Sequence, residues 1–146
     1  MNKLSWSLIS IALIATVTNS TNIAKSQPLA KVEGKLIYPS DYLPSLRVCA
    51  TTIDSKQRYC VKTKEGQATF SMEIPPNQYM FSAQNDNSSM IAWMTSFNID
   101  CGAACANNPI HVLRVDVESW RTTTEICPCD WYTQKDKLIF PDSQIQ

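Results

Sequence analysis

The feature of this sequence that most constrains its fold is a strict alternation of apolar and polar residues over residues 68–74. At the two-residue period of a β-strand, alternation places one set of side chains on a buried face and the other toward water. The predicted inward residues are Ala68, Phe70, Met72 and Ile74, and the predicted outward residues are Thr69, Ser71 and Glu73. Two prolines at 75–76 then end the strand, because proline has no amide hydrogen for a sheet.

The rest of the chain also has strand patterns. A return strand is predicted over residues 78–83, with Tyr79, Phe81 and Ala83 inward. Segments that alternate, or are rich in β-branched and aromatic residues, lie at 32–38, 46–52, 91–99, 110–117 and 122–126. No window of a dozen residues has a helical stripe of apolar side chains. About seven short strands in a chain of 146 residues predict a single-domain, all-β sandwich.

Two cysteines flank a predicted hairpin turn at Asp54-Ser55. Cys49 and Cys60 stand at equal distances from that turn, so antiparallel pairing places them directly opposite each other. Their Cβ atoms are then close enough for a disulfide bond, which stabilises a fold by about 3 kcal/mol for a loop of this length. The sequence therefore predicts a Cys49–Cys60 bridge in a disulfide-stabilised domain.

The other four cysteines, Cys101, Cys105, Cys127 and Cys129, allow two interpretations. Their C-x3-C and C-x-C spacings resemble a metal site, but structural zinc sites favour pairs separated by two to four residues, which Cys127-Pro-Cys129 does not match. Disulfides are favoured, with no metal and no cofactor. The connectivity stays open between a local 101–105 bridge and cross-bridges from 101 and 105 to 127 and 129. A bridge within 127–129 is disfavoured because it closes a very small ring.

Residues 1–26 have the pattern of a secretory signal peptide, with a basic start at Lys3, an apolar run over 4–17 and small residues at Ala24 and Ser26. An uncleaved membrane anchor is the alternative, but the apolar run is shorter than the roughly 20 residues that a spanning helix needs. Cleavage would leave one domain over residues 27–146, with 11 basic and 13 acidic residues and a net charge of −2. We therefore expect an exported protein, periplasmic or extracellular, with no membrane span after cleavage.

Three segments together resemble a known family. Residues 32–50 are similar to the opening of bacterial carboxypeptidase-regulatory-like (transthyretin-like, prealbumin-like) domains, and residues 70–83 resemble their strand–turn–strand motif around a Pro-x-Gly-x-Tyr sequence. Asp130-Trp131-Tyr132 is similar to the close of an uncharacterised exported subgroup, so the resemblance covers about residues 30–133. It implies a seven-stranded Greek-key sandwich, usually non-catalytic. Two departures are Asn77, where the family usually has Gly, and Trp120, near the usual Gly of the last hairpin. Asn tolerates a left-handed conformation, so we expect the first turn to survive.

An enzyme is not expected. His111, the only histidine, lies in phase with Leu113, Val115 and Val117, which is typical of a satisfied rim or core residue. Paired carboxylates could come from Asp86, Asp100, Asp116 and Glu118, but the last two share a predicted solvent face, where acidic residues are ordinary. Three glycines in total do not make a phosphate-binding loop. Equal numbers of basic and acidic residues, 13 each, argue against nucleic acid as a partner.

Two functions therefore remain. The first is a non-catalytic exported module with a structural or protein-interaction role at the cell envelope, for which the Pro-bounded loop over residues 38–44 is a contact surface. The second is a carbohydrate-binding module that stacks envelope polysaccharide on exposed aromatic side chains. The candidate binding residues are Trp120, Tyr42, Trp93, Trp131 and Tyr132. Trp120 is the best candidate for exposure, because it sits at a predicted hairpin end, whereas burial is expected for Trp93 and Trp131. Asn87 begins a glycosylation sequon.

Overall fold

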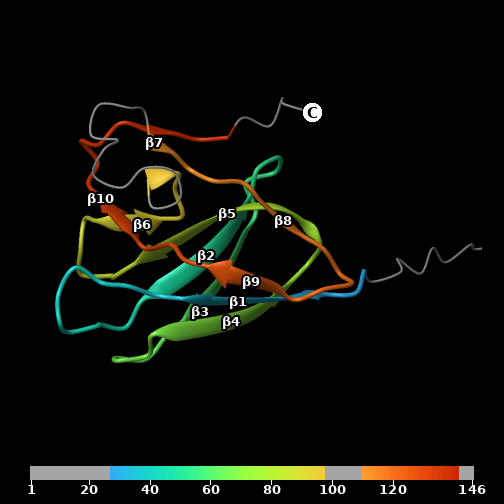
Figure 1. The fold of residues 1–146 in the computed structure, drawn as a ribbon, viewed down its shortest axis with the longest axis horizontal. Helices are drawn as coiled ribbons and strands as arrows, with labels where there is room; N and C mark the ends of the chain where they lie inside the picture. Colours follow the sequence, from blue (N-terminus) through green and yellow to red (C-terminus); the bar gives the residue numbers. More distant parts are fainter. Residues whose placement is uncertain (1–26, 98–109, 142–146) are drawn as a thin grey trace, which may run out of the picture.

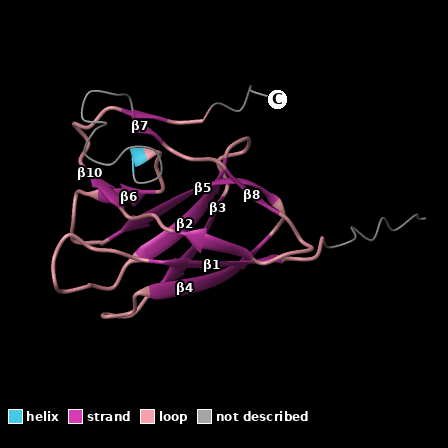
Figure 2. Ribbon diagram, viewed as in Figure 1, coloured by secondary structure: helices cyan, strands magenta, loops and turns pink. Residues whose placement is uncertain are grey.

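The structure is a computed structural model that describes residues 27–97 and 110–141. Strands dominate its regular structure, as Figures 1 and 2 show. They are β1 (Ala30–Lys35), β2 (Arg47–Thr52), β3 (Arg58–Lys62), β4 (Thr69–Ile74), β5 (Asn77–Gln84), β6 (Ile91–Trp93), β7 (Ile110–His111), β8 (Val115–Val117), β9 (Thr123–Ile126), β10 (Asp130–Tyr132) and β11 (Leu138–Ile139). The all-β prediction is confirmed, although the strands outnumber the predicted seven. The predicted signal peptide lies outside the described residues.

Two main sheets share one hydrophobic core. The smaller sheet has the order β4-β1-β9, and the larger has the order β10-β6-β5-β2-β3, with β8 also paired to β5. Both sheets contribute to the buried cluster between them, for example Val32 and Phe70 from the smaller and Val48 and Phe81 from the larger. A third, two-stranded sheet of β7 and β11 lies apart from these two layers in Figure 1.

The predicted strand–turn–strand over residues 68–83 forms both strands but does not pair them. β4 pairs with β1, whereas β5 pairs with β2, so the prolines at 75–76 mark a crossing between the two sheets. The hydroxyl of Tyr79 donates to the carbonyl oxygen of Pro75 at 2.7 Å and closes this crossing. Asn77 does not have a positive φ; the positive-φ residues other than glycine in the described chain are Lys56 and Glu125. The expected left-handed turn at Asn77 is therefore wrong.

Burial on β4 follows the predicted alternation, with Phe70, Met72 and Ile74 inward, but Ala68 precedes the strand and is exposed. Burial on β5 extends to both faces. Tyr79, Phe81 and Ala83 face the main core as predicted, and Met80 packs in a second cluster with Ile53 and Val112. Alternation failed on β5 because segments distant in sequence cover its outer face.

The segment predicted as one strand over residues 110–117 divides into β7 and β8. The break shifts the alternation: Val112 is buried, whereas His111 is exposed. The prediction that His111 is a rim or core residue in phase with Val115 is therefore wrong. The strands β6, β10 and β11 are short. Of the strand predicted over residues 91–99, only 91–93 form β6, residues 94–97 lie outside any named strand, and 98–99 lie outside the described residues.

Close packing between the strands of the smaller sheet requires a glycine. A Cβ atom on Gly34 would collide with the ring of Phe70 on β4 and with the backbone carbonyl oxygen of Ile126 on β9. Gly34 lies opposite Phe70 in the β1–β4 register, so the aromatic ring folds over the place where a side chain would be. This contact joins all three strands of the sheet.

Candidate functional site

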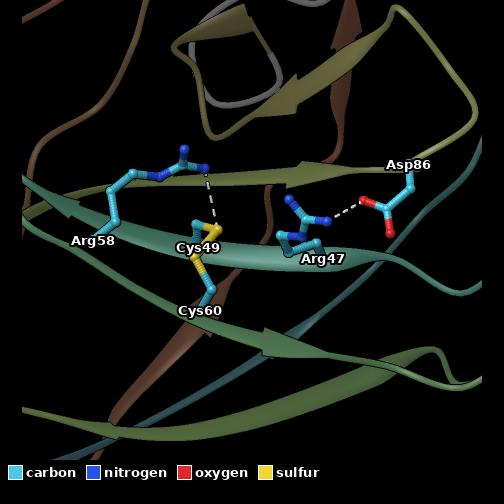
Figure 3. The surroundings of a disulfide bond; sticks show 5 residues. All are labelled: Arg47, Cys49, Arg58, Cys60 and Asp86. Carbon is cyan, nitrogen blue, oxygen red and sulfur yellow. Dashed lines mark hydrogen bonds and ion pairs between the residues drawn. A yellow bond between two sulfur atoms is a disulfide. The ribbon is translucent and has the colours of Figure 1, made fainter.

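The β2–β3 hairpin carries the predicted disulfide bond. Cys49 pairs with Cys60 in the register, between Val48↔Val61 and Ala50↔Tyr59, and the two sulfurs are bonded with their Cα atoms 4.1 Å apart. Both the bridge and the pairing about the Asp54-Ser55 turn are confirmed. Figure 3 shows the bridge on the outer face of the larger sheet, with a guanidinium nitrogen of Arg58 donating to Cys49 Sγ at 3.3 Å.

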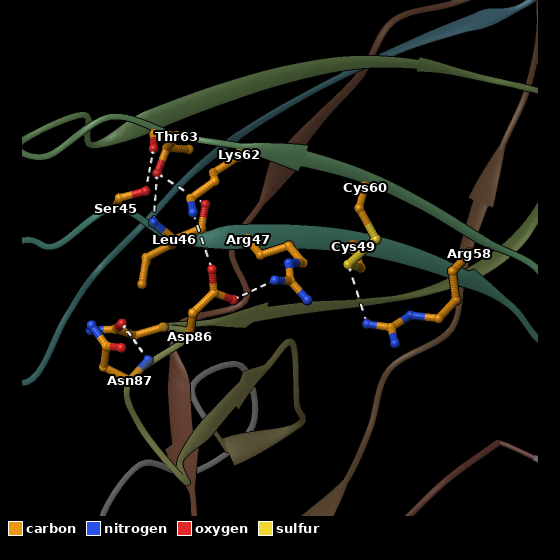
Figure 4. Close-up of polar contacts among 11 residues, drawn as sticks. Ser45, Leu46, Arg47, Cys49, Arg58, Cys60, Lys62, Thr63, Asp86 and Asn87 are labelled. Atoms are coloured by element: carbon orange, nitrogen blue, oxygen red, sulfur yellow. Dashed lines mark hydrogen bonds and ion pairs between the residues drawn. A yellow bond between two sulfur atoms is a disulfide. The ribbon is translucent and has the colours of Figure 1, made fainter.

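A polar network holds the open end of the same hairpin, as Figure 4 shows. The backbone amide of Leu46 donates to the hydroxyl of Thr63 at 3.0 Å, and Ser45 donates to the Thr63 carbonyl oxygen at 2.7 Å. Asp86, which follows β5, accepts from Lys62 at 3.1 Å and from Arg47. The hydrogen bond from Lys62, with the nearby Arg47 charge, holds the pKa of the Asp86 carboxyl below its ordinary value.

A second bridge joins Cys127 to Cys129, contrary to the expectation that so small a ring is disfavoured. Pro128 between them is buried, and the two Cα atoms are 5.1 Å apart, a spacing that disulfides commonly have. This bridge leaves neither Cys127 nor Cys129 as a thiolate for zinc or as a partner for a cross-bridge. Cys101 and Cys105 lie outside the described residues.

A pocket of about 370 Å³ lies beside β10. Its lining is largely apolar and comes from the loop after β1, from two residues at positions 97 and 110, and from residues 129–132 at β10: Ile37, Tyr38, Pro39, Phe97, Ile110, Cys129, Asp130, Trp131 and Tyr132. We call it the Trp131 pocket. The indole N–H of Trp131 donates to the Ile37 carbonyl oxygen at 2.7 Å, and the ring meets Tyr38 edge-on with centroids 4.9 Å apart. Trp131 thereby fixes the loop after β1 against the larger sheet.

The polar side of the Trp131 pocket is a hydrogen-bonded group around a buried threonine. Thr95 donates to a carboxylate oxygen of Asp130 at 2.6 Å and shares a hydrogen bond of 3.2 Å with the Tyr132 hydroxyl. Burial raises the pKa of the Asp130 carboxyl, and the hydrogen bonds from Thr95 partly offset that effect. Burial likewise raises the pKa of Tyr132. Asp130 and Tyr132, which both line the pocket, are thus linked through Thr95.

Trp93 lies on the opposite face of the larger sheet from Trp131. In the β6–β10 register, Trp93 is opposite Asp130, and Trp131 is opposite Ala92, so the alternation separates the two indoles. Trp93 packs on the second buried cluster and meets Phe140 edge-on at 5.1 Å. Trp131 packs on the main core. Both indoles are partly buried, so each contributes to packing and has only part of its ring open to solvent.

Trp120 is the most exposed large apolar side chain of the described chain, with an exposed fraction of 75%. It borders a hollow of about 400 Å³ whose lining includes amide, carboxylate and hydroxyl side chains: Pro76, Asn77, Gln78, Asp116, Val117, Glu118, Ser119 and Trp120. The guanidinium carbon of Arg121 lies 5.1 Å from the centre of the indole, and Arg121 pairs with Glu118 at 2.9 Å. We call this place the Trp120 hollow. Its exposed indole agrees with the position predicted at a hairpin end.

Of the other candidate residues, Tyr42 and His111 line neither the Trp131 pocket nor the Trp120 hollow. Tyr42 is 59% exposed in the loop after β1, where a hydrogen bond with Glu65 raises its pKa. His111 is exposed on β7, and Asp116 lines the Trp120 hollow. The predicted aromatic residues thus lie in at least three places rather than on one flat surface. Asp100 lies outside the described residues.

Sequence reasoning named Trp131 and Tyr132 but missed the residues that complete their pocket. Ile37 and Thr95 carry no motif, and their positions beside β10 depend on contacts across more than thirty intervening residues, as in the Thr95–Asp130 hydrogen bond. The Pro-bounded loop over 38–44 was the usable signal, because Tyr38, its first residue, meets the Trp131 ring edge-on.

Comparisons with family models, with curated proteins and with solved structures find no match to this chain. The part of the chain that the structure describes has no helix long and apolar enough to cross a membrane.

Proposed function

We propose that this chain is a non-catalytic, exported β-sandwich module, of the seven-stranded Greek-key type found in carboxypeptidase-regulatory-like domains, that binds a protein partner at the cell envelope. The observation that carries the proposal is the Trp131 pocket. It is concave and largely apolar, and Ile37 on its rim is 57% exposed. Aromatic and aliphatic side chains around one satisfied polar group are typical of the centre of a protein interface.

The loop after β1 supports this proposal. Its Trp131 contacts hold the backbone at residues 37–38 in place, so the exposed Ile37 side chain is presented on a rigid segment. Tyr42 further along the same loop is also exposed. A preorganised loop loses little conformational entropy on binding, which favours affinity. Two disulfide bonds in the described chain suit an oxidising compartment and support export.

The test uses cross-linking from the pocket rim. A photo-reactive amino acid at position 37 of the exported protein is expected to form an adduct of one defined mass with an envelope protein. Excess wild-type protein should suppress this adduct, and excess Ile37→Asp protein should not. Leu29 is the matched control, because it is similarly exposed but precedes β1 at the other end of that strand. Equal suppression by both competitors, or the same adduct from position 29, contradicts the proposal.

Export itself has a separate test. The predicted cleavage site gives a mature protein that begins at Gln27. Intact-mass measurement of the exported protein should find that mass, and retention of Met1 or Lys3 would contradict a cleaved signal peptide.

A second candidate function is carbohydrate binding at the Trp120 hollow. The specific observation is an exposed indole beside amide, carboxylate and hydroxyl side chains, which can stack on the apolar face of a sugar and bond its hydroxyl groups. Acrylamide quenching of tryptophan emission, with and without envelope polysaccharide, tests it. Protection that disappears in Trp120→Ala but persists in Tyr42→Ala supports carbohydrate binding, and unchanged quenching in the wild-type protein contradicts it.

A further inference from the structure

The Cys49–Cys60 bridge is asymmetric in its exposure. Cys49 lies on β2, in the interior of the larger sheet, and is 1% exposed. Cys60 lies on β3, the last strand in the order of that sheet, and is exposed. A thiol in solution can therefore reach Cys60 more easily than Cys49.

The direction of attack reinforces this asymmetry. A thiolate displaces one sulfur of a disulfide in line with the sulfur–sulfur bond, from the side opposite the sulfur that leaves. Attack on Cys60 comes from beyond β3, at the sheet edge. Attack on Cys49 would come from over β5, where the buried Ser82 stands opposite Cys49 in the register. The sheet thus leaves open the approach to Cys60.

Arg58 favours the same direction. Its guanidinium group donates to Cys49 Sγ at 3.3 Å, and Arg58, Cys60 and Lys62 share the outer face of β3. When Cys60 is attacked, Cys49 is the sulfur that leaves as a thiolate. A cation in hydrogen-bond contact stabilises a thiolate and speeds its departure, because exchange is faster with a better leaving thiol.

We propose that the Cys49–Cys60 bridge is a site of thiol–disulfide exchange with low-mass thiols, in which the thiol attaches to Cys60 and Arg58 holds the departing Cys49 thiolate. The incoming thiol first loses its proton to solvent. Its sulfur forms a new bond to Cys60 Sγ as the Cys49–Cys60 bond breaks, and that bonding electron pair remains on Cys49. The product is a mixed disulfide on Cys60, with no net oxidation or reduction. Arg58 is a positioning residue in this step.

The test follows the reaction of the folded, oxidised protein with reduced glutathione at pH 8. Samples are quenched with N-ethylmaleimide, which traps the freed thiol before it closes the bridge again, and are mapped by mass spectrometry of peptides. We expect glutathione on Cys60 and maleimide on Cys49. Glutathione mainly on Cys49, equal amounts on both, or no adduct at either cysteine overturns the proposal.

Variants then test Arg58 itself. Arg58→Gln should slow adduct formation by about threefold to tenfold, and Arg58→Lys should recover part of the rate because it keeps a cation. Arg47→Gln is the matched control, since Arg47 shares the outer face in Figure 3 but bonds to Asp86 instead of sulfur. Urea midpoints of both variants report folding, and a loosened hairpin would accelerate exchange. An Arg58→Gln rate equal to or above that of Arg47→Gln refutes the role of Arg58.

Discussion

Removal of the hairpin disulfide gives the most quantitative prediction about this fold. Cys49 and Cys60 are 11 positions apart, and cross-linking a loop of that length removes conformational entropy from the unfolded chain worth about 3 kcal/mol at 25 °C. Cys49 is also buried, so its change to alanine costs up to about 1 kcal/mol more in lost packing. We expect the Cys49→Ala/Cys60→Ala double variant to lose about 3–4 kcal/mol of unfolding free energy.

The matched control is the Cys127→Ala/Cys129→Ala double variant. Its cysteines are separated by only two positions, and the same entropy relation gives about 1.5 kcal/mol for so short a loop. The assay is urea unfolding of residues 27–146 under oxidising conditions, followed by tryptophan emission. The hairpin variant should also show a larger m-value, because its unfolded chain is less compact. A loss below 1 kcal/mol for the hairpin variant, or a larger loss for the control, would refute the reasoning.

Three further predictions concern packing, ionisation and the cysteines. Gly34→Ala should destabilise the fold by about 2–3 kcal/mol in urea, because the added methyl group meets Phe70; Gly66→Ala, with open space but a φ of +71°, should lose only about 1 kcal/mol. Burial raises the pKa of Tyr79 to about 12, so its contribution to stability is complete below pH 10 and is lost as pH rises toward 12; unfolding of Tyr79→Phe should lack this part of the alkaline loss. Thiol titration of the denatured, unreduced protein should find no free thiol, and two or more thiols or stoichiometric zinc would contradict full pairing.

The candidate site was only partly predictable. The sequence placed Trp131 and Tyr132 among the binding residues because large aromatic side chains are scarce and informative in a small domain. It could not show that Thr95 bonds to Asp130, or that Ile37 accepts from the Trp131 indole, because nothing local links residues so far apart. The family resemblance led to a wrong expectation at Asn77, where the chain turns without a left-handed residue.

The sequence alone determined the local features, those set by interactions within a segment of about a dozen residues. The alternation over β4 and the symmetry of Cys49 and Cys60 about their turn both persisted, because strand period and hairpin register are set by neighbouring residues. The tertiary structure decided which sheet each strand joined. It put β4 and β5 in different layers, covered the outer face at Met80 and left His111 exposed. These outcomes depend on which distant apolar faces pack together, and that choice minimises exposed surface over the whole chain rather than within any segment.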